Sequence, residues 1–499
     1  MKKLFLDSRV MDKRAREDFN LTEDLMMENA AAALENAVLP YVFHESGRYI
    51  DRPHVLILCG SGNNGADGYA LARRLVCHEF TVTCCIVDEP KSELCILQKK
   101  RAQKAGVFFI DFYSLDDFIE QKSFDLTVAV DCIFGSGFHQ PLSPNAEAVL
   151  LSVSKIQCRK ISCDVPTGLD ALGNGKTIFK ADETVTIGSL KFALFSDKAK
   201  DFTGKITLAN LGISQTNFEH EGKFIPDACL LEKSEMILPW RNKNNVHKGT
   251  FGHAVIAAGE KSGAANIAAM AAFNFGAGLV SLCGTESSSC ISIMTCNELP
   301  ENTSALLLGS GFGRKNPDAQ KYLAYLCEHK DIPFVLDADI FYYDEIKTFL
   351  VTNCSDEKNC RCILTPHLKE FSVLLAKCSL GNFTTEEVME NRLELAKKFT
   401  ELYKGCVLVL KGAVTLIATW SAKENRAAVY LNPYGTNCLA KGGSGDVLAG
   451  LCLSLLAQKY NAINAAVSAG LAHSFASQKY EGSFALTPEK IIEEIEFIK

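Results

Sequence analysis

The sequence predicts an α/β protein of two domains, each built on a sheet covered by helices. The chain has 499 residues, and at roughly 100–250 residues per domain this length accommodates two or three domains. Short apolar runs alternate with helical patterns, which is typical of parallel sheets. This alternation stops between residues 210 and 239, where Pro, Gly and mixed charge gather. We therefore expect one domain over residues 1–215, a linker over 216–235 and a second domain over 236–499.

The apolar runs are the predicted strands. In the first half they are His54–Leu58, Thr81–Val87, Leu126–Val130 and Arg159–Cys163; in the second half they are Ala254–Ala258, Ala305–Leu308, Phe334–Leu336, Ile363–Leu364 and Val407–Leu410. In parallel sheets, ligands bind at the loops that follow the carboxyl ends of the strands. The residues directly after these runs are therefore the candidates for chemistry.

The net charge and the cysteine content indicate which classes of binding partner and which cellular compartment to expect. The net charge is −7 and the pI is about 5.9, which argues against nucleic acid or an anionic membrane as the main partner. None of the 20 cysteines forms a C-x-x-C pair, and many lie in apolar runs. They are predicted to be buried free thiols in a reducing cytosol. Because no export signal begins the chain, we expect a cytoplasmic protein.

One segment imitates a membrane span. Gly263–Leu282 carries no charge, but it is rich in Ala and Gly and is interrupted by Gly276-Ala277-Gly278. A spanning helix is more strongly apolar over about 20 residues. We expect instead a close-packed buried helix, a glycine turn and a strand.

Glycine-rich and acidic loops follow three strands of the first half. Cys59–Gly68 leads from a strand into a helix, an arrangement that suits an anion at the helix N-terminus. Asp88, about 20 residues further on, is a candidate for binding a ribose. Asp131 and Asp164 end the next two strands, and the oxygen ligands Asn64, Asp131, Asp164 and Thr167 together favour a hard cation.

These motifs, with Met27–Ala30 upstream, resemble the NAD(P)H-hydrate epimerase family over about residues 1–215. The resemblance implies a Rossmann-like three-layer sandwich that interconverts the R and S hydrates at C6 of the nicotinamide ring. It implies K⁺ ligands Asn64, Asp131 and Thr167. The implied substrate-binding residues are Asn63, Asn64, Gly65, Ala66, Asp67, Gly135, Ser136, Gly137, Phe138, His139, Gln140, Pro141 and Asp164. Ala66 stands where the family usually has Gly, and Gln140 stands where Arg is common.

The second half contains a denser signal, Ala440–Gly450, with the sequence AKGGSGDVLAG. The N–H groups of Gly443–Gly445 are predicted to form an anion hole for a phosphoryl group in transfer. Asp446 lies in the first turn of the helix that follows, in the position of a general base for an attacking hydroxyl. His367, next to Pro366 at a strand's end, is a ligand candidate, whereas His473 on an apolar helix is predicted to be core.

Further polar segments follow the strands of this half: Gly309–Gly313, Asp337–Asp339, Thr365–Glu370 and Lys411–Thr415. Together with the glycine loop they resemble the ADP- or ATP-dependent NAD(P)H-hydrate dehydratase family over about residues 230–499. The resemblance implies a ribokinase-like α/β domain, which transfers phosphate from Mg²⁺-ADP to the 6-hydroxyl of the hydrate and then eliminates it. Asp446 would be the base. Ala264, Gly311, His367 and Asp446 would contact the hydrate, and Lys411, Gly412, Ala413, Val414, Thr415 and Gly445 would hold the nucleotide.

The two resemblances together predict a bifunctional repair enzyme, in the order found in fused bacterial proteins. Its substrates would be NADH hydrate, NADPH hydrate and ADP; no nucleic acid or membrane partner is expected, and a homo-oligomer is possible. One alternative is a small-molecule kinase, which would release a stable phosphorylated product. Another is a non-catalytic scaffold of the kind found in RNA-decay proteins, for which Asp131 and Asp164 would be dispensable.

Overall fold

The computed structural model describes residues 1–42, 53–122, 126–220, 223–285 and 288–499. The chain divides into two compact units: the N-terminal unit, Lys3–Asp227, and the C-terminal unit, Ala228–Lys499 with Met1–Lys2. The division falls inside the predicted linker, which holds most of a short helix, α7 (Gln215–Phe218), and a strand, β9 (Ala228–Leu230). Parts of the predicted domains and linker (residues 43–52, 123–125, 221–222 and 286–287) lie outside the described residues.

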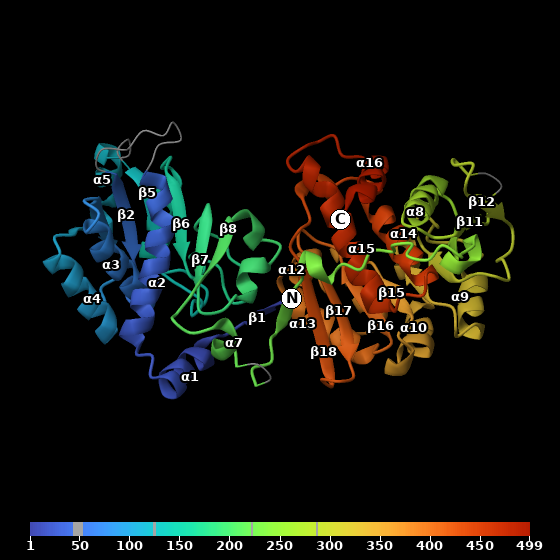
Figure 1. The fold of residues 1–499 in the computed structure, drawn as a ribbon, viewed down its shortest axis with the longest axis horizontal. Helices are drawn as coiled ribbons and strands as arrows, with labels where there is room; N and C mark the ends of the chain where they lie inside the picture. The colour runs from blue at the N-terminus through green and yellow to red at the C-terminus, as the bar shows by residue number, and fades with distance from the viewer. Residues whose placement is uncertain (43–52, 123–125, 221–222, 286–287) are drawn as a thin grey trace. The chain divides into compact units, whose positions relative to one another are not determined.

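The N-terminal unit contains a seven-stranded sheet in the order β4-β3-β2-β5-β6-β7-β8, with all neighbours parallel. Its strands are β2 (His54–Cys59), β3 (Thr81–Ile86), β4 (Phe108–Asp111), β5 (Leu126–Cys132), β6 (Arg159–Cys163), β7 (Glu183–Ile187) and β8 (Lys205–Ala209). Its other helices are α1 (Arg9–Phe19), α2 (Glu23–Val38), α3 (Asn63–Val76), α4 (Glu93–Lys104), α5 (Leu115–Lys122) and α6 (Pro144–Ser154). The four strands predicted in this half are therefore confirmed (Figure 1).

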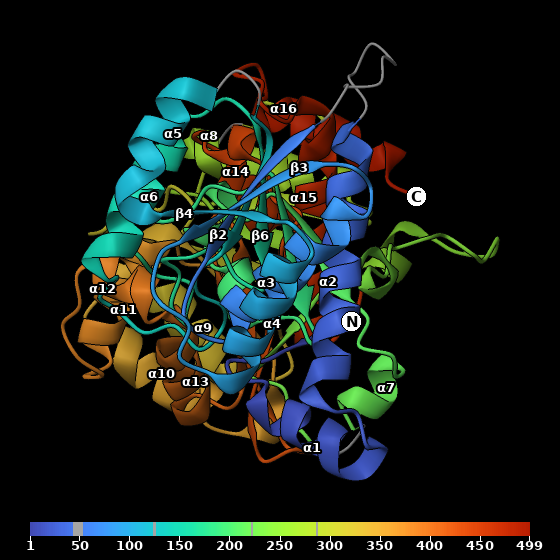
Figure 2. The ribbon, with the colours of Figure 1, turned by 90° about the vertical axis from the view of Figure 1, so that its left-hand side faces the viewer.

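Helices cover both faces of this sheet, as side-chain alternation along β2 requires. Val55 and Ile57 pack in one core with residues of α2 and α3, whereas Leu56 and Leu58 pack in another with residues of α5 and α6. Figure 2 shows these helix pairs on opposite sides of the strands. The predicted three-layer α/β arrangement of the first domain is confirmed.

The C-terminal unit contains the larger sheet, whose strands from β9 run in the order β9-β18-β17-β16-β15-β14-β13-β10-β11-β12. They are β10 (His253–Ala257), β11 (Leu279–Cys283), β12 (Met294–Cys296), β13 (Ala305–Leu308), β14 (Phe334–Leu336), β15 (Cys362–Leu364), β16 (Cys406–Leu410), β17 (Thr415–Ser421) and β18 (Arg426–Asn432); β1 (Lys2–Leu4) begins the chain. The helices are α8 (Ser262–Asn274), α9 (Ala319–Glu328), α10 (Ile346–Cys354), α11 (Leu368–Lys377), α12 (Thr385–Glu390), α13 (Arg392–Leu402), α14 (Ser444–Ala457), α15 (Ala462–Ser477) and α16 (Pro488–Glu494).

The uncharged segment after Gly263 forms the predicted buried helix, turn and strand: α8, then Gly276–Gly278, then β11. Helix α8 lies against α14, and the approach is close because a Cβ added at Gly450 would stand 2.2 Å from the carbonyl oxygen of Ala268. Among the described residues, no helix has the length and apolarity to cross a membrane.

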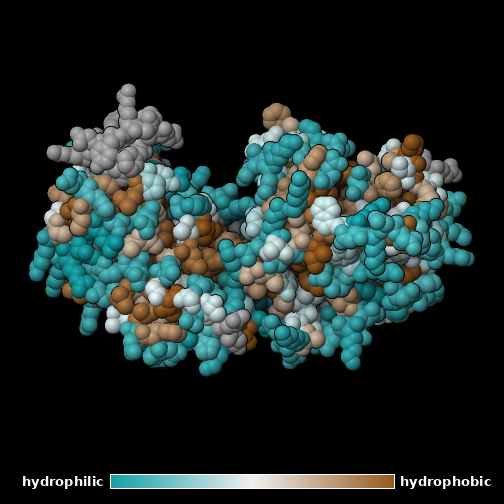
Figure 3. Space-filling view, in the orientation of Figure 1, coloured by the Kyte–Doolittle hydropathy of each residue, from teal (hydrophilic) through white to brown (hydrophobic). Residues whose placement is uncertain are grey.

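The sheet of the C-terminal unit is not wholly parallel. Strands β10 to β16 pair in parallel, but β17 pairs antiparallel with both β16 and β18. The sequence analysis identified β16 and did not anticipate this hairpin extension. All twenty cysteines are free thiols, as predicted, but only thirteen are buried; six are partly buried and Cys77 is exposed. Figure 3 shows a mainly hydrophilic surface with scattered apolar side chains, which is ordinary for a folded protein.

Candidate active sites

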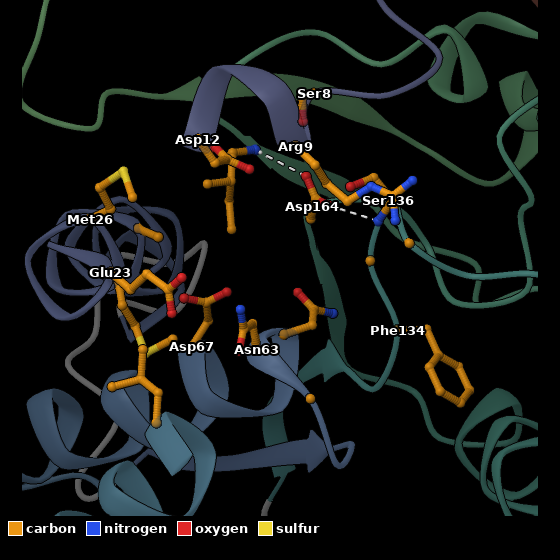
Figure 4. Close-up of a pocket in the computed structure, with 18 of the residues that line it drawn as sticks. Ser8, Arg9, Asp12, Glu23, Met26, Asn63, Asp67, Phe134, Ser136 and Asp164 are labelled. Atoms are coloured by element: carbon orange, nitrogen blue, oxygen red, sulfur yellow. Dashed lines mark hydrogen bonds between the residues drawn. The ribbon is translucent and has the colours of Figure 1, made fainter. Parts of the chain in front are cut away.

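A cavity of about 580 Å³ lies at the carboxyl ends of β2, β5 and β6 in the N-terminal unit. Its lining includes most of the predicted substrate residues: Asn63, Asn64, Asp67, Gly135, Ser136, Gly137, Phe138 and Asp164. Figure 4 shows Asn63, Asp67 and Asp164 arranged around this space. The sequence thus located the cavity through the loops after three strands.

Other predicted residues lie beside the cavity rather than in its lining. Gly65 and Ala66 are buried in the first turn of α3. His139, Gln140 and Pro141 are exposed, and Gln140 uses its side-chain amide to donate to the carbonyl of Gly168 at 2.8 Å. Asp88, the ribose candidate, accepts a hydrogen bond from Asn145 at 3.2 Å and is likewise absent from the cavity lining.

Two glycines at this site leave no room for a Cβ. A Cβ at Gly65 would stand 2.0 Å from the carbonyl oxygen of Gly60, and one at Gly135 would stand 2.7 Å from the side-chain Oδ2 of Asp164. Real Cβ atoms do not approach other heavy atoms this closely. The glycine pattern of these loops therefore follows from packing as well as from ligand binding.

Asp164 is the most constrained carboxylate of the cavity. Its backbone has φ +67°, a region that non-glycine residues seldom adopt. Its Oδ1 forms an ion pair with Nζ of Lys191 at 2.6 Å, and its Oδ2 accepts from the backbone N–H of Ser136 at 2.8 Å. Burial alone would raise the pKa of Asp164, but Lys191 and these hydrogen bonds hold it below its ordinary value.

Two further acids face the same space without such support. Asp67 is 7% exposed, and burial followed by the charge of Asp164 raises its pKa well above the ordinary value. Burial also raises the pKa of Asp12, which α1 supplies. The sequence did not indicate Asp12 or Lys191. Asp12 lies inside helix α1, and Lys191 follows β7, which was not among the predicted strands.

Asp131 and Thr167 lie beneath the cavity. Both oxygens of Asp131 accept from Thr167: Oδ1 from the hydroxyl at 2.7 Å and Oδ2 from the backbone N–H at 2.8 Å. Burial raises the pKa of Asp131 to about 6, although these hydrogen bonds oppose the shift. The buried amide nitrogen and oxygen of Asn64 have no hydrogen-bond partner in the described structure.

The second site lies in the C-terminal unit, where the glycine loop meets α14. Gly443 has φ +89° and a Cβ there would stand 2.6 Å from Cγ of Pro488, so this position needs glycine. The helix begins at Ser444, which places Asp446 in its first turn. Backbone N–H groups of the glycine loop and the carboxyl of Asp446 therefore lie at the same helix end, and the N–H of Ser444 donates to the carbonyl of Lys441 at 3.2 Å.

Lys411 lies within ion-pair distance of two acids of this site, Asp337 and Glu370. Its Nζ lies 2.9 Å from Oδ1 of Asp337 and 3.9 Å from Oε2 of Glu370. A Cβ at Gly445 would stand 3.2 Å from the same Nζ, so Lys411 lies against the glycine loop. Burial disfavours its charge, but Asp337 and Glu370 outweigh this and raise the pKa of Lys411 above its ordinary value.

Asp337 is held by neutral donors as well as by Lys411. The hydroxyl of Thr365 donates to it at 2.8 Å and that of Ser310 at 3.1 Å.

Burial, followed by the nearby charge of Asp337, raises the pKa of Asp446 to about 6. A carboxylate with this pKa can accept a proton near neutral pH, which is the property required of a general base.

The predicted hydrate contacts are placed by two loops. Gly311 has φ +62°, and a Cβ there would lie 2.9 Å from Cβ of Ala264, so these two predicted residues are adjacent. His367 caps α11 together with Glu370, and its Nε2 lies 3.1 Å from Oε1 of Glu370. With a side chain 49% exposed, His367 remains accessible to a ligand.

The predicted nucleotide segment Lys411–Thr415 joins β16 to β17. Gly412 and Ala413 are exposed at this turn, whereas Val414 is buried and its carbonyl accepts from Arg392 at 2.8 Å. His473 is buried, as predicted, but its Nε2 lies 3.0 Å from the carbonyl oxygen of Ser444. It thus supports the start of α14, a role that its position on an apolar helix did not reveal.

Comparison with known proteins agrees with this division. A family model described as NAD(P)H-hydrate dehydratase matches residues 254–496, and one described as YjeF-related protein N-terminus matches residues 23–193. A solved structure from Bacillus subtilis, described as ADP/ATP-dependent NAD(P)H-hydrate dehydratase co-crystallized with ATP/Mg²⁺, is 23% identical with a TM-score of 0.44; the match covers 54% of this chain and 97% of that one.

Two curated relatives match nearly the whole chain, and both are described as bifunctional NAD(P)H-hydrate repair enzyme Nnr. The relative from Coxiella burnetii is 30% identical, with 87% of this chain and 86% of the relative covered. The relative from Helicobacter pylori is 41% identical, with 97% of each chain covered. The chain belongs to the family of bifunctional NAD(P)H-hydrate repair enzymes.

Proposed function

We propose that this chain restores hydrated NADH and NADPH in two steps, one in each unit. The cavity of the N-terminal unit interconverts the R and S hydrates at C6 of the nicotinamide ring. The site at the start of α14 converts the S hydrate to NAD(P)H. The observation that carries the second step is Asp446, a partly buried carboxyl with its pKa raised to about 6, in the first turn of a helix that follows a glycine loop.

In the dehydration, Asp446 accepts the proton of the 6-hydroxyl while the hydroxyl oxygen bonds to the terminal phosphorus of ADP. The bridging P–O bond breaks and AMP leaves. Phosphate then leaves C6 with the electron pair of the C6–O bond and takes up the proton lost from C5, which forms the C5–C6 double bond. The N–H groups of Gly443–Gly445 and the ammonium of Lys411 stabilise the transferring phosphoryl group, since both lie at this helix end.

ADP is the proposed donor, and Mg²⁺ arrives as its complex with the nucleotide. In the described part of the chain, no group of three or more His, Cys, Asp or Glu side chains could hold a metal. Oxygen atoms of the phosphates can supply most Mg²⁺ ligands, since Mg²⁺ retains waters and binds few protein carboxylates. The exposed turn at Gly412 and Ala413 is the proposed nucleotide contact next to Lys411.

K⁺ is the proposed cation of the N-terminal site, with Asn64, Asp131 and Thr167 as its ligands. The unpartnered buried amide of Asn64 supports this proposal, because an unsatisfied buried polar group calls for a partner. Asp131 is fully buried, and none of the ion pairs found among described residues includes it. When bound, K⁺ supplies positive charge that favours the ionised form of Asp131.

The decisive experiment follows the absorbance of reduced nicotinamide in a mixture of R and S NADH hydrate with protein, Mg²⁺, K⁺ and either ADP or ATP. We expect complete recovery of NADH with ADP. Complete recovery with ATP alone would replace ADP as donor. Recovery that stops at the S fraction would remove the epimerase from the proposal, and a stable phosphorylated product without NADH would establish a small-molecule kinase instead.

A further inference from the structure

The acids of the N-terminal cavity do not share one environment. Asp164 forms an ion pair with the ammonium of Lys191 at 2.6 Å and accepts a hydrogen bond from the N–H of Ser136. Lys191 is 2% exposed and also donates to the carbonyl of Ile187. This lysine is therefore a fixed counter-ion, and Asp164 is the carboxylate that it keeps ionised.

Asp67 faces the same cavity from the first turns of α3 but has no cation of its own. Among the described hydrogen bonds, its contact is with the thiol of Cys163, whose Sγ lies 3.9 Å from Oδ2. The largest charge effects on it come from Asp164 and Asp12, which disfavour its ionisation, and from Lys191, which favours it. Arg9, Arg16 and Glu23 also line the cavity, but Arg9 is paired with Asp7 and Arg16 with Glu23. Burial and the two acids prevail, so the pKa of Asp67 lies well above its ordinary value.

Two carboxyls whose environments drive their proton affinities apart are a recurring arrangement for acid–base chemistry. We propose that Asp67 is the proton donor and acceptor of epimerisation, and that the Lys191–Asp164 ion pair holds the other carboxylate ionised beside it. This inference rests on the proposed epimerase function and assigns its chemistry to one side chain.

The step is balanced without a further reactant. The carboxyl proton of Asp67 passes to the 6-hydroxyl, the C6–O bond breaks with its electron pair on oxygen, and water leaves. The lone pair of N1 forms a C6–N1 double bond. Water then adds to the opposite face of C6, and its proton returns to the carboxylate of Asp67.

Asp12 is the alternative candidate for the proton donor, so the effect of substituting Asp12 can be compared with that of substituting Asp67. It lies on α1 and is only partly buried, whereas Asp67 is on a helix that the glycine loop packs against β2 and β5. Rigid elements position catalytic groups more accurately than peripheral ones. We therefore expect Asp67→Asn to abolish the reaction and Asp12→Asn to reduce it only slightly.

The test measures conversion of pure R hydrate to S hydrate by separation of the epimers. The variants are Asp67→Asn, Asp12→Asn and Asp111→Asn, the last a control at an exposed strand end of the same unit. General acid catalysis contributes about 10²–10⁴-fold, so Asp67→Asn is expected to lose at least about 100-fold in kcat. Dehydration of S hydrate by the same preparations should stay unchanged, because its site belongs to the other unit. Thermal unfolding of each variant, compared with wild type, reports whether the N-terminal unit is folded.

Two further readouts separate a proton-transfer role from a structural one. Wild-type epimerisation should fall as pH rises, because Asp67 acts in its protonated form, and reaction in H₂¹⁸O should place ¹⁸O at C6 faster than in an enzyme-free control. Retention of more than half the rate in Asp67→Asn, or retention of ¹⁶O during turnover, would overturn the assignment. A wild-type protein that cannot epimerise would instead remove the proposed function itself.

Discussion

Both sites place one lysine among several carboxyls, yet they use it differently. In the N-terminal cavity, Lys191 forms an ion pair with Asp164 at 2.6 Å, whereas burial and the charge of Asp164 raise the pKa of Asp67 well above its ordinary value. In the C-terminal site, Lys411 contacts Asp337 at 2.9 Å and also lies against Gly445 of the glycine loop. In each site the lysine favours the ionised form of the carboxyl that it contacts.

The two proton-exchanging acids consequently act in opposite forms. Asp446 must be ionised to accept a proton, whereas Asp67 must be protonated to donate one. The first has a pKa of about 6, and the pKa of the second lies well above the ordinary value. In the proposed reactions, the same residue type thus serves as base in one unit and acid in the other, because burial and neighbouring charge differ.

The largest effect should come from Asp446→Asn. Dehydration should fall by about 10³-fold, since the amide cannot accept the hydroxyl proton. Epimerisation should be unaffected, because Asp446 belongs to the other unit. Both rates can be measured on one preparation, with R hydrate alone for the first unit and S hydrate with ADP for the second. Loss of both activities would contradict the independence of the two sites.

A substitution at Gly65 should have the opposite selectivity and reduce epimerisation without affecting dehydration. In Gly65→Ala the new Cβ would meet the carbonyl oxygen of Gly60 at 2.0 Å, so the loop must move. Misplacement of about 1 Å can cost about 100-fold in rate, and we expect a loss of this size in epimerisation only. Gly62→Ala is the control, because nothing lies within 4 Å of a Cβ there. Equal effects of the two variants would show that packing at Gly65 is unimportant.

The pH dependence sharpens the comparison further. The pKa of Asp446 is raised to about 6, and the base acts when ionised, so dehydration should fall about tenfold for each pH unit below about 6. The rate of epimerisation should have the opposite pH dependence and decline as pH rises. The kcat/KM of each half-reaction against pH tests both signs. A dehydration rate that is constant below pH 6 would exclude Asp446 as the base.

The smallest effect is expected when a proposed K⁺ ligand, Asn64, is replaced. In Asn64→Ala the K⁺ concentration for half-maximal epimerisation should rise about tenfold, which corresponds to about 1.4 kcal/mol. Dehydration measured at the same K⁺ concentrations should not change. Titration of K⁺ against a constant ionic strength maintained with a large organic cation provides the measurement. An unchanged titration would remove Asn64 from the ligand set.

Much of both sites could be predicted because local pattern encodes strand ends. Asp164 directly follows β6, and Asp446 lies in the first turn of the helix after the glycine loop. Parallel strands bring such element ends to one edge of the sheet. Lys191 could not be found this way. It follows β7 in an apolar stretch, and only the fold brings it within 2.6 Å of Asp164.

The sequence by itself determined two α/β units, the loops that carry the candidate sites and the position of Asp446, the proposed general base, since strand periodicity and glycine spacing are local properties. The tertiary structure decided the ionisation of the acids. Asp12, Asp67, Asp164 and Lys191 come from different segments of the chain, and the supporting contact of His473 with Ser444 spans 29 residues. Proton affinity depends on burial and on charges a few ångströms away, and folding alone establishes those distances.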